Sequence, residues 1–422
     1  TGVINGVEYT VVDRDMLDDI MYPTNNVYGP ITADLTKICT SRITDMSSLI
    51  FGCGDDFNQP IGNWDVSNVT DMSFMFSFEC GLLQFNQDIS YWDVSNVSNM
   101  EWMFYGAESF NQPIGGWDVS NVSNMEWMFY GAESFNQPIG GWDVSSVTSM
   151  WSMFFGATDF NQPIGNWDVS NVTNMNSMFS NSVFNQPIGN WDVSSVTSMW
   201  SMFFGATNFN QPIGDWDVSS VTNMYRMFSS ENVQMSMEFN QPIGNWDVSN
   251  VTNMYQMFFG ANYFNQPIGD WDVSSVTDMN GMFYHATSFN QDIDSWDVSN
   301  VTNMYQMFLY ANTFNQPIGD WDVSSVTDMN GMFLSAYAFN QPIGNWDVSN
   351  VTNMYQMFSG SVAFNQPIGD WDVSSVTNMN SMFSSATLFN EDLSSWNVNN
   401  VTNYANFSFN TPNWTLPKPN FQ

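Results

Sequence analysis

Apolar and polar positions recur along this chain with a period of about 25 residues. Tryptophan marks the period most clearly, and most steps from Trp64 to Trp396 are 25 residues long. In one typical repeat, residues 160–179, the apolar side chains are Phe160, Ile164, Trp167, Val169, Val172, Met175, Met178 and Phe179. Because no single repeat can bury such a face alone, the period predicts a repeat solenoid of about fifteen repeats.

The first half of each repeat has the spacing of a short parallel strand. Ile164, Trp167 and Val169 fall in the apolar-x-x-apolar-x-apolar pattern of a leucine-rich-repeat strand. By the two-residue period of a strand, Trp167 and Val169 should point inward, and Asp168 and Ser170 outward. The pattern therefore predicts a leucine-rich-repeat-like fold with one short parallel strand per repeat.

The second half of each repeat predicts a helical or 3-10 turn. Val172, Met175, Met178 and Phe179 follow one another at spacings of three, three and one, which favours a short turn with one buried face. A glycine often comes next, where a left-handed residue can end the turn. These glycines are Gly106, Gly131, Gly156, Gly205, Gly260 and Gly360.

The Phe-Asn-Gln-Pro segment is predicted to be the corner at which the chain returns to the next repeat. Proline limits backbone pairing there because it has no N–H donor. The corner asparagines, such as Asn111, Asn136 and Asn161, should stack at equivalent positions. Their side chains are expected to hydrogen-bond the backbone of the neighbouring corners.

Both ends of the chain depart from the repeat and are expected to cap it. Residues 1–34 predict a strand pair around Asn5-Gly6 and a short helix over residues 13–21. The solenoid then covers residues 35–409, and residues 410–422 form a proline-containing tail that should not continue a sheet. Ends that look closed in this way favour a finished module.

Composition narrows the range of partners. The chain has 42 acidic and five basic residues, which gives a net charge of −37. Such a charge repels phosphate groups, so binding to nucleic acids or to membrane surfaces is a poor interpretation. Cations and basic partners are favoured instead. The chain contains no run of eighteen apolar residues, so the sequence predicts no membrane-spanning segment. Hydrophobic residues make up 43% of the chain, which is enough for a sizeable core.

One aspartate per repeat forms an outward row, which is the main candidate site. Carboxylates about 5 Å apart repel by on the order of 0.8 kcal/mol per pair even in water. The row should therefore bind cations such as calcium, accept hydrogen bonds, or extend into solvent. Calcium-binding repeats usually have denser acidic spacing, which favours the last two. If the row lies on the strand face, it could also form an acidic groove for a cationic partner. Its members are Asp65, Asp93, Asp118, Asp143, Asp168, Asp192, Asp217, Asp247, Asp272, Asp297, Asp322, Asp347 and Asp372.

Asn-x-Ser/Thr sequons form a second row of candidates. In a eukaryotic secretory route they could carry glycans, whereas in most bacteria they would be plain turn residues. They lie at Asn68, Asn96, Asn121, Asn171, Asn250, Asn300, Asn350, Asn400, Asn406 and Asn413.

Three cysteines leave one without a partner. Cys53 and Cys80 follow equivalent positions of adjacent repeats, so a disulfide between them is compatible with the spacing. Two buried thiols are the alternative. A disulfide would indicate an oxidising compartment.

Enzyme signatures are missing from the sequence. His285 is the only histidine, so neither a histidine-based triad nor a multi-histidine metal site can be built. We therefore expect no catalysis and no required cofactor.

The insertions at residues 79–84 and 231–238 interrupt an otherwise regular side of the solenoid. They are candidate contact points.

The repeated run Asn-Gln-Pro-Ile-Gly-Asn-Trp-Asp-Val-Ser-Asn-Val-Thr-Asn-Met-x-x-Met-Phe closely resembles the BspA-like leucine-rich-repeat surface proteins, over about residues 35–409. The resemblance implies a secreted or cell-surface protein with no shared catalytic residues. Two functions follow as hypotheses. The first is adhesion or display, binding a protein or glycan surface through an acidic, aromatic-rich flank. The second is a structural protomer that self-associates into an extracellular fibre or surface coat.

Overall fold

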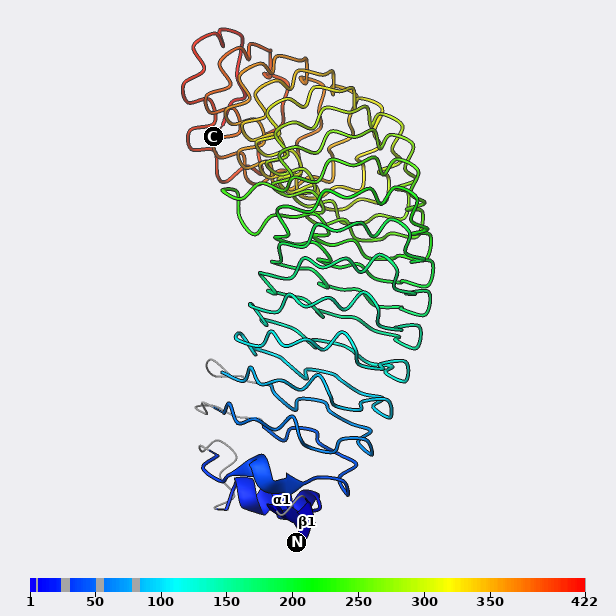
Figure 1. Cartoon of the computed structure of the whole chain (residues 1–422). Coiled ribbons are helices and arrows are strands. Elements are labelled where there is room, and N and C mark those ends of the chain that lie inside the picture. The colour runs from blue at the N-terminus through cyan, green and yellow to red at the C-terminus, as the bar shows by residue number, and fades with distance from the viewer. Residues whose placement is uncertain (5–6, 24–30, 51–56, 78–83, 422) are drawn as a thin grey trace. The chain divides into compact units, whose positions relative to one another are not determined.

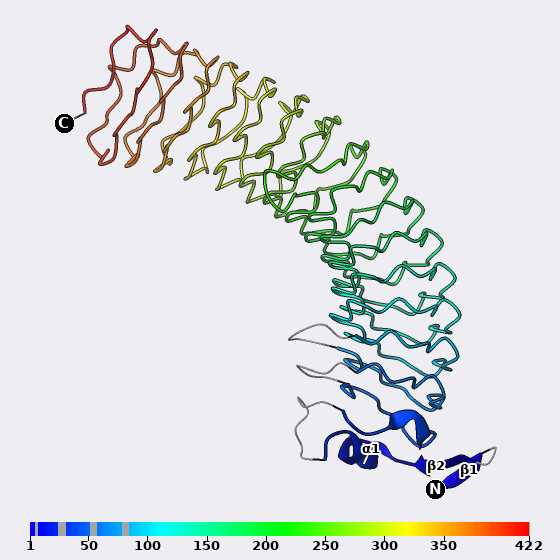
Figure 2. The same ribbon diagram turned by 60° about the vertical axis from the view of Figure 1, so that its left-hand side comes forward.

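The rows of apolar side chains predicted from the period form the core. The computed structural model describes residues 1–4, 7–23, 31–50, 57–77 and 84–421, which fall into two compact units, Thr1–Val196 and Thr197–Gln422. Within each unit, successive repeats lie side by side (Figures 1 and 2). In the first unit Trp167 is 4% exposed and Phe160 is fully buried. Each fully buried side chain of this kind contributes about 1.5–3 kcal/mol, so the stacking of repeats stabilises each unit.

Aromatic rings stack from repeat to repeat inside the core. The rings of Phe160 and Phe184 are 6.1 Å apart, and those of Trp167 and Trp191 are 6.5 Å apart and nearly parallel. The indole N–H of Trp167 donates to the carbonyl of Ile139 in the preceding repeat, at 3.1 Å. The tryptophan row thus satisfies its buried polar atom while it fills the core.

Backbone pairing between repeats lies in the second half of the repeat, not in the first. Isolated parallel bridges join equivalent residues, such as Asn124 to Ser149 and Ser149 to Asn174. From there every second amide donates to the next repeat: Met150 to the carbonyl of Asn174 (3.0 Å) and Ser152 to that of Asn176 (2.8 Å). The prediction that the parallel strand spans Ile164 to Val169 is therefore wrong.

The paired segment is a series of overlapping turns rather than a helix. Met153 N–H donates to the Met150 carbonyl and Ala157 N–H to the Phe154 carbonyl, both at 3.2 Å. Ser152 (φ 52°) and Gly156 (φ 66°) hold the third position of these turns in the left-handed region. A right-handed helical or 3-10 turn cannot contain such residues, so that prediction is wrong. The prediction of left-handed glycines is confirmed at all six positions.

The Ile–Trp–Val segment alternates between buried and exposed residues because it too consists of turns. Trp167 N–H donates to the Ile164 carbonyl (3.1 Å), and Val172 N–H donates to the Val169 carbonyl (2.9 Å). Consecutive turns bury Trp167 and Val169 and expose Asp168, as a strand would. Two-residue periodicity alone did not separate the two conformations.

Corner asparagines link the repeats as predicted. The Asn136 amide donates to the Asn111 side-chain oxygen at 3.1 Å, and Gln137 Nε2 donates to the same oxygen at 2.8 Å. Three residues after the corner glutamine the backbones come close together. A Cβ added to Gly165, which follows Gln162 in this way, would lie 2.4 Å from the Pro187 carbonyl oxygen. Only glycine fits such an approach without local separation of the repeats.

At its N-terminal end the chain forms a small sheet and a helix. Strand β1 (Gly2–Ile4) pairs antiparallel with β2 (Val7–Val11), and β2 pairs parallel with β3 (Ile38–Cys39). Helix α1 (Arg14–Met21) begins at the Asp13 side chain, which accepts from the Met16 amide. A 3-10 helix, η1 (Leu35–Lys37), leads into β3.

The C-terminal tail continues the packing of the last repeat, which the sequence did not predict. Trp414 is 6% exposed and packs edge-on against Phe389, at 4.7 Å. The Thr415 amide donates to the side-chain oxygen of Asn390 (2.7 Å), so the asparagine row of the corners extends by one more step. Among the described residues, no helix is long and apolar enough to cross a membrane.

Candidate interaction surface

All thirteen aspartates of the predicted row are exposed, but they lie between two turns and not on a strand. Each accepts the amide of the serine two residues later; Asp168 Oδ1 accepts Ser170 N–H at 3.1 Å and its hydroxyl at 2.7 Å. These hydrogen bonds, led by that from the hydroxyl, lower the pKa of the Asp168 carboxyl. Each aspartate therefore stabilises its own turn.

Calcium binding by this row stays a prediction. Among the residues that the structure describes, no group of three or more His, Cys, Asp or Glu side chains could hold a metal ion. What the row offers a cation is single carboxylates, each already bonded to a serine.

The sequon asparagines also link repeats. Asn171 Nδ2 donates to the Ser145 carbonyl of the preceding repeat at 2.8 Å, and Asn121 Nδ2 does so to Ser95 at 2.7 Å. Where serine replaces asparagine, Ser146 Oγ makes the same bond to the Ser120 carbonyl, at 2.7 Å. Corresponding bonds are formed by Asn68, Asn96, Asn250, Asn300, Asn350 and Asn400. A structural role is thus present at these eight positions, and glycosylation stays a prediction.

The proposed disulfide and the first insertion cannot be placed. Cys53, Cys80 and residues 79–83 lie outside the described residues. Cys39 is a free, partly buried thiol whose sulfur lies 3.5 Å from the Ser41 hydroxyl. The second insertion is anchored at its end, because Met237 is fully buried while Met235 is 43% exposed.

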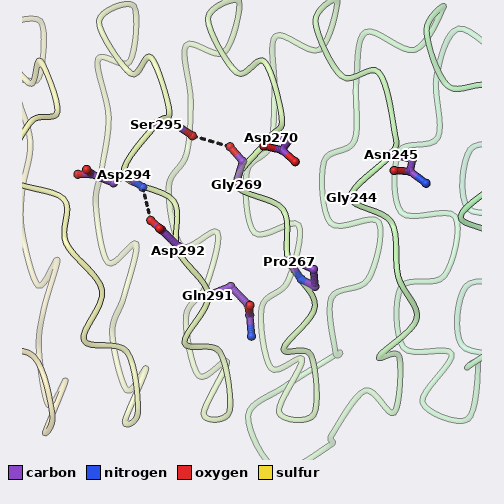
Figure 3. Close-up of a pocket in the computed structure, with 9 residues that line it drawn as sticks. All are labelled: Gly244, Asn245, Pro267, Gly269, Asp270, Gln291, Asp292, Asp294 and Ser295. Carbon is purple, nitrogen blue, oxygen red and sulfur yellow. Dashed lines mark hydrogen bonds between the residues drawn. The ribbon is translucent and has the colours of Figure 1, made fainter.

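A hollow of about 520 Å³ lies on the second unit, beside Asp292 and Asp294 (Figure 3). Asp294 occupies the position that is a glycine in most corners, such as Gly269. Ser295 Oγ bridges to the Gly269 carbonyl at 2.6 Å. Partial burial, followed by repulsion from Asp320 and Asp292, raises the pKa of Asp294. The remaining lining residues are Gly244, Asn245, Pro267, Asp270 and Gln291.

The most unusual surface of the first unit is a cluster of seven half-buried aromatic rings on the outside of the paired segment, here called the aromatic stripe. One row has ring centroids 5.2 Å apart between Phe74 and Trp102, 4.8 Å between Trp102 and Trp127, and 5.1 Å between Trp127 and Trp151. A second row lies beside it, with Tyr105 4.5 Å from Trp102. The stripe consists of Phe74, Trp102, Tyr105, Trp127, Tyr130, Trp151 and Phe155.

Two partly buried carboxylates lie among these rings. Glu101 accepts from Asn124 Nδ2 at 3.2 Å, and Glu126 accepts from the Ser149 hydroxyl. Burial raises the pKa of Glu101, and repulsion from Glu126 and Asp71 adds to it. The stripe therefore combines apolar ring surface with negative charge that is poorly hydrated.

Three rings of the stripe occupy strained backbone positions. Phe74, Trp102 and Trp127 have φ values of 56°, 57° and 57°, in the left-handed region that bulky residues rarely adopt. Other repeats place Ser177 or Gly281 at the same position. The strain costs on the order of 1 kcal/mol per residue, and the core does not require these rings.

In the second unit, an arginine takes the equivalent position. Arg226 (φ 54°) places its guanidinium carbon 5.2 Å from the ring centroid of Phe204 and 5.7 Å from that of Tyr225. Its Nε also donates to Gln256 Oε1 at 2.7 Å. The aromatic rows of the repeat are thus able to carry a guanidinium.

Sequence reasoning expected an aromatic-rich flank without locating it. The available signal was variation between repeats. The first, second and fifth positions after the first methionine change from repeat to repeat, whereas the flanking core positions stay the same. Aromatic residues are densest at these three variable positions between residues 74 and 155, and they recur less densely in later repeats, as at Trp200 and Tyr255.

Solved structures give only distant similarities. A leucine-rich-repeat protein from Bacteroides ovatus matches with 10% identity over 68% of this chain and 75% of its own, at a TM-score of 0.35. The TLR13–ssRNA13 complex matches with 9% identity over 74% and 59%, at 0.17. A circular leucine-rich-repeat protein matches with 16% identity over 91% and 70%, at 0.22. At such scores the fold assignment rests on the repeat geometry described above.

A family model gives the clearest match. No curated protein matches the chain. One family model matches four times in succession, over residues 21–140, 124–236, 230–333 and 312–415, and so spans nearly all of the repeats. The chain therefore belongs to the DUF285 family, described as Mycoplasma protein of unknown function.

Proposed function

We propose that this chain is a non-enzymatic binding scaffold of the cell exterior, which adheres to or displays a partner through the outside of its paired segments. The aromatic stripe is the observation that carries the proposal. Half-buried aromatic rings that the core does not need, gathered on adjacent repeats, are typical of binding surfaces. The rigid stack of repeats holds these rings in fixed positions, which lowers the entropic cost of binding.

The remaining chemistry of the described residues supports binding over catalysis. The exposed aspartates accept hydrogen bonds from their own serines and are not poised as acids or bases. His285, the only histidine, bonds to the Asn262 side chain at 3.1 Å and has its pKa lowered by partial burial.

The test compares variants of unchanged net charge. The chain, the W102S/W127S variant and a Tyr263→Ser variant are immobilised and exposed to a panel of purified extracellular proteins and oligosaccharides. Tyr263 is 56% exposed and lies outside the stripe, so it controls for loss of any surface ring. Saturable binding that weakens only in W102S/W127S supports the proposal. Equal behaviour of all three proteins across the panel contradicts it.

A cell-surface location is a separate part of the proposal, supported by the sequence resemblance. Intact producing cells are treated with protease before lysis, and the chain is detected by antibody. Loss of the chain from intact cells is expected. Full protection, with degradation only after lysis, would contradict an exterior location.

Assembly into a fibre is the second candidate. One feature favours it: among the described residues β1 pairs only with β2, which leaves its other edge open, and Val3 on β1 is 69% exposed. Open strand edges pair with other chains. Electron microscopy of the purified chain decides, because regular filaments support this candidate and discrete particles exclude it.

A further inference from the structure

We propose that the aromatic stripe binds arginine or lysine side chains of a partner protein, with Glu101 and Glu126 as the counter-charges. This inference rests on the proposed binding function and names the chemistry of the partner. Four observations lead to it: the lack of basic residues in this part of the chain, the mixture of rings and carboxylates, the geometry of Arg226, and the backbone strain.

Charge is the first argument. No lysine, arginine or histidine occurs between Arg42 and Arg226, a stretch that contains the whole stripe. Glu101 and Glu126 are partly buried among rings, where a charge is worth more than in water. The chain has no basic residue in that stretch to neutralise them, so a cation supplied by a partner complements the surface.

Shape and chemistry favour a basic side chain over a simple ion. Arginine and lysine have long apolar stems that pack on ring surface while the charged head reaches a carboxylate. The stripe presents both features, since Trp102 lies beside Glu101 in the sequence and Trp127 beside Glu126. A metal ion would not use the rings.

The second unit contains an example of an arginine packed on aromatic rings of the same rows. Arg226 lies over Phe204 and Tyr225, in the same rows that form the stripe, and it occupies the position of Trp127. Its guanidinium is held by the Gln256 side chain at 2.7 Å. In the stripe the acceptors would be the Glu101 and Glu126 carboxylates, which lie one position earlier in the repeat than Gln256. Carboxylates bind a guanidinium more strongly than an amide does.

Backbone strain is the last argument. The left-handed conformation of Trp102 and Trp127 belongs to this position of the repeat, where Ser152 holds it as well. Bulky residues that persist in such conformations are more common at functional sites than elsewhere. The turn requires a left-handed residue at this position but not an aromatic one, so the rings are available for binding.

The experiment titrates the folded chain with a fluorescein-labelled peptide of three arginines alternating with glycines, at about 0.15 M salt, where exposed charges more than about 8 Å apart are largely screened. The same peptide with citrulline in place of arginine keeps the shape and removes the charge. W102S/W127S keeps the net charge of −37, so it separates binding at the stripe from general attraction. E101Q/E126Q is matched by D347N/D372N, which changes the net charge equally in the second unit.

The expected result is saturable binding of the arginine peptide that becomes about tenfold weaker in W102S/W127S, as the loss of two ring contacts implies. E101Q/E126Q should weaken it more than D347N/D372N does, and Tyr263→Ser should leave it unchanged. The citrulline peptide should not bind. Circular dichroism spectra and unfolding temperatures of the variants check that the repeats stay folded.

Three outcomes overturn the inference. Equal affinity of the wild type and W102S/W127S would show that general acidity attracts the peptide. No binding of the peptide would exclude basic side chains as the partner chemistry. Stripe-dependent binding of a neutral oligosaccharide without the peptide would identify a glycan partner; the proposed binding function would then stand while this inference fails.

Discussion

The inside and corner of each repeat differ from the outside of its paired segment in how much their residues vary between repeats. Inside and at the corner, the same residues return in nearly every repeat, as at Phe160, Asn161 and Trp167. Outside the paired segment the residue changes, as from Trp127 to Ser152 to Ser177. The first region contacts the equivalent residue of the next repeat in the ring and asparagine rows, so each repeat constrains its neighbours. The second region is constrained by little except the backbone and is open to function.

Removing a core ring should cause the largest loss of stability. Phe160→Ala deletes a fully buried ring that stacks 4.0 Å from Phe154 and 6.1 Å from Phe184. We expect a loss of about 3–5 kcal/mol, measured by hydrogen exchange of the surrounding amides, since unfolding of a repeat protein need not be two-state. A loss below about 1 kcal/mol, typical of surface sites, would show that the rows are not energetically coupled.

A methyl group at the corner glycine should have the next largest effect. The new Cβ of Gly165→Ala would lie 2.4 Å from the Pro187 carbonyl oxygen, so the two repeats must separate. A cost of about 1–3 kcal/mol is expected in urea unfolding. Gly116→Ala is the matched control, because its Cβ meets nothing within 4 Å. Equal effects of the two substitutions would contradict the close approach.

The asparagine row should contribute comparably. Asn161→Ala removes the acceptor of the Asn185 amide (3.0 Å) and of Gln186 Nε2 (3.2 Å). Leaving these donors without a partner should cost about 1–2 kcal/mol, measured in the same urea series. Asn166→Ala, at an exposed position of the turn that follows this corner, should change stability little. Equal urea midpoints for the two variants would show that the asparagine row contributes nothing to stability.

Acid should weaken the aspartate turns by a smaller amount. Hydrogen bonds from Ser145 and Ser170 lower the folded-state pKa of Asp143 and Asp168. Their stabilising contribution is present above the unfolded pKa of about 3.9 and is lost as pH falls through the lowered folded values. D143N/D168N keeps the side-chain oxygen and removes the titration. Its urea midpoint should therefore fall less than that of the wild type between pH 5 and pH 2, and parallel falls would contradict this role.

The sequence predicted the repeat, its buried rows, the left-handed glycines and the asparagine corner, because each follows from a side chain that must meet its equivalent one period later. It misplaced the backbone pairing. Turns at Trp167 and Val172 alternate buried and exposed residues as a strand does, so periodicity could not separate them. The stripe was not located because Trp102 and Trp127 stand beside core aromatics in the sequence, and only the structure shows that they stay partly exposed.

The central claim is that the stripe serves binding while the core and corner rows serve stability. The most direct test compares the thermal unfolding of W102S/W127S with that of Phe160→Ala, with circular dichroism as the readout. We expect the double variant to unfold within a few degrees of the wild type, since each site should lose only about 1 kcal/mol or less, while Phe160→Ala unfolds well below both. An unfolding temperature of W102S/W127S as low as that of Phe160→Ala would show that the rings are structural and would contradict the account.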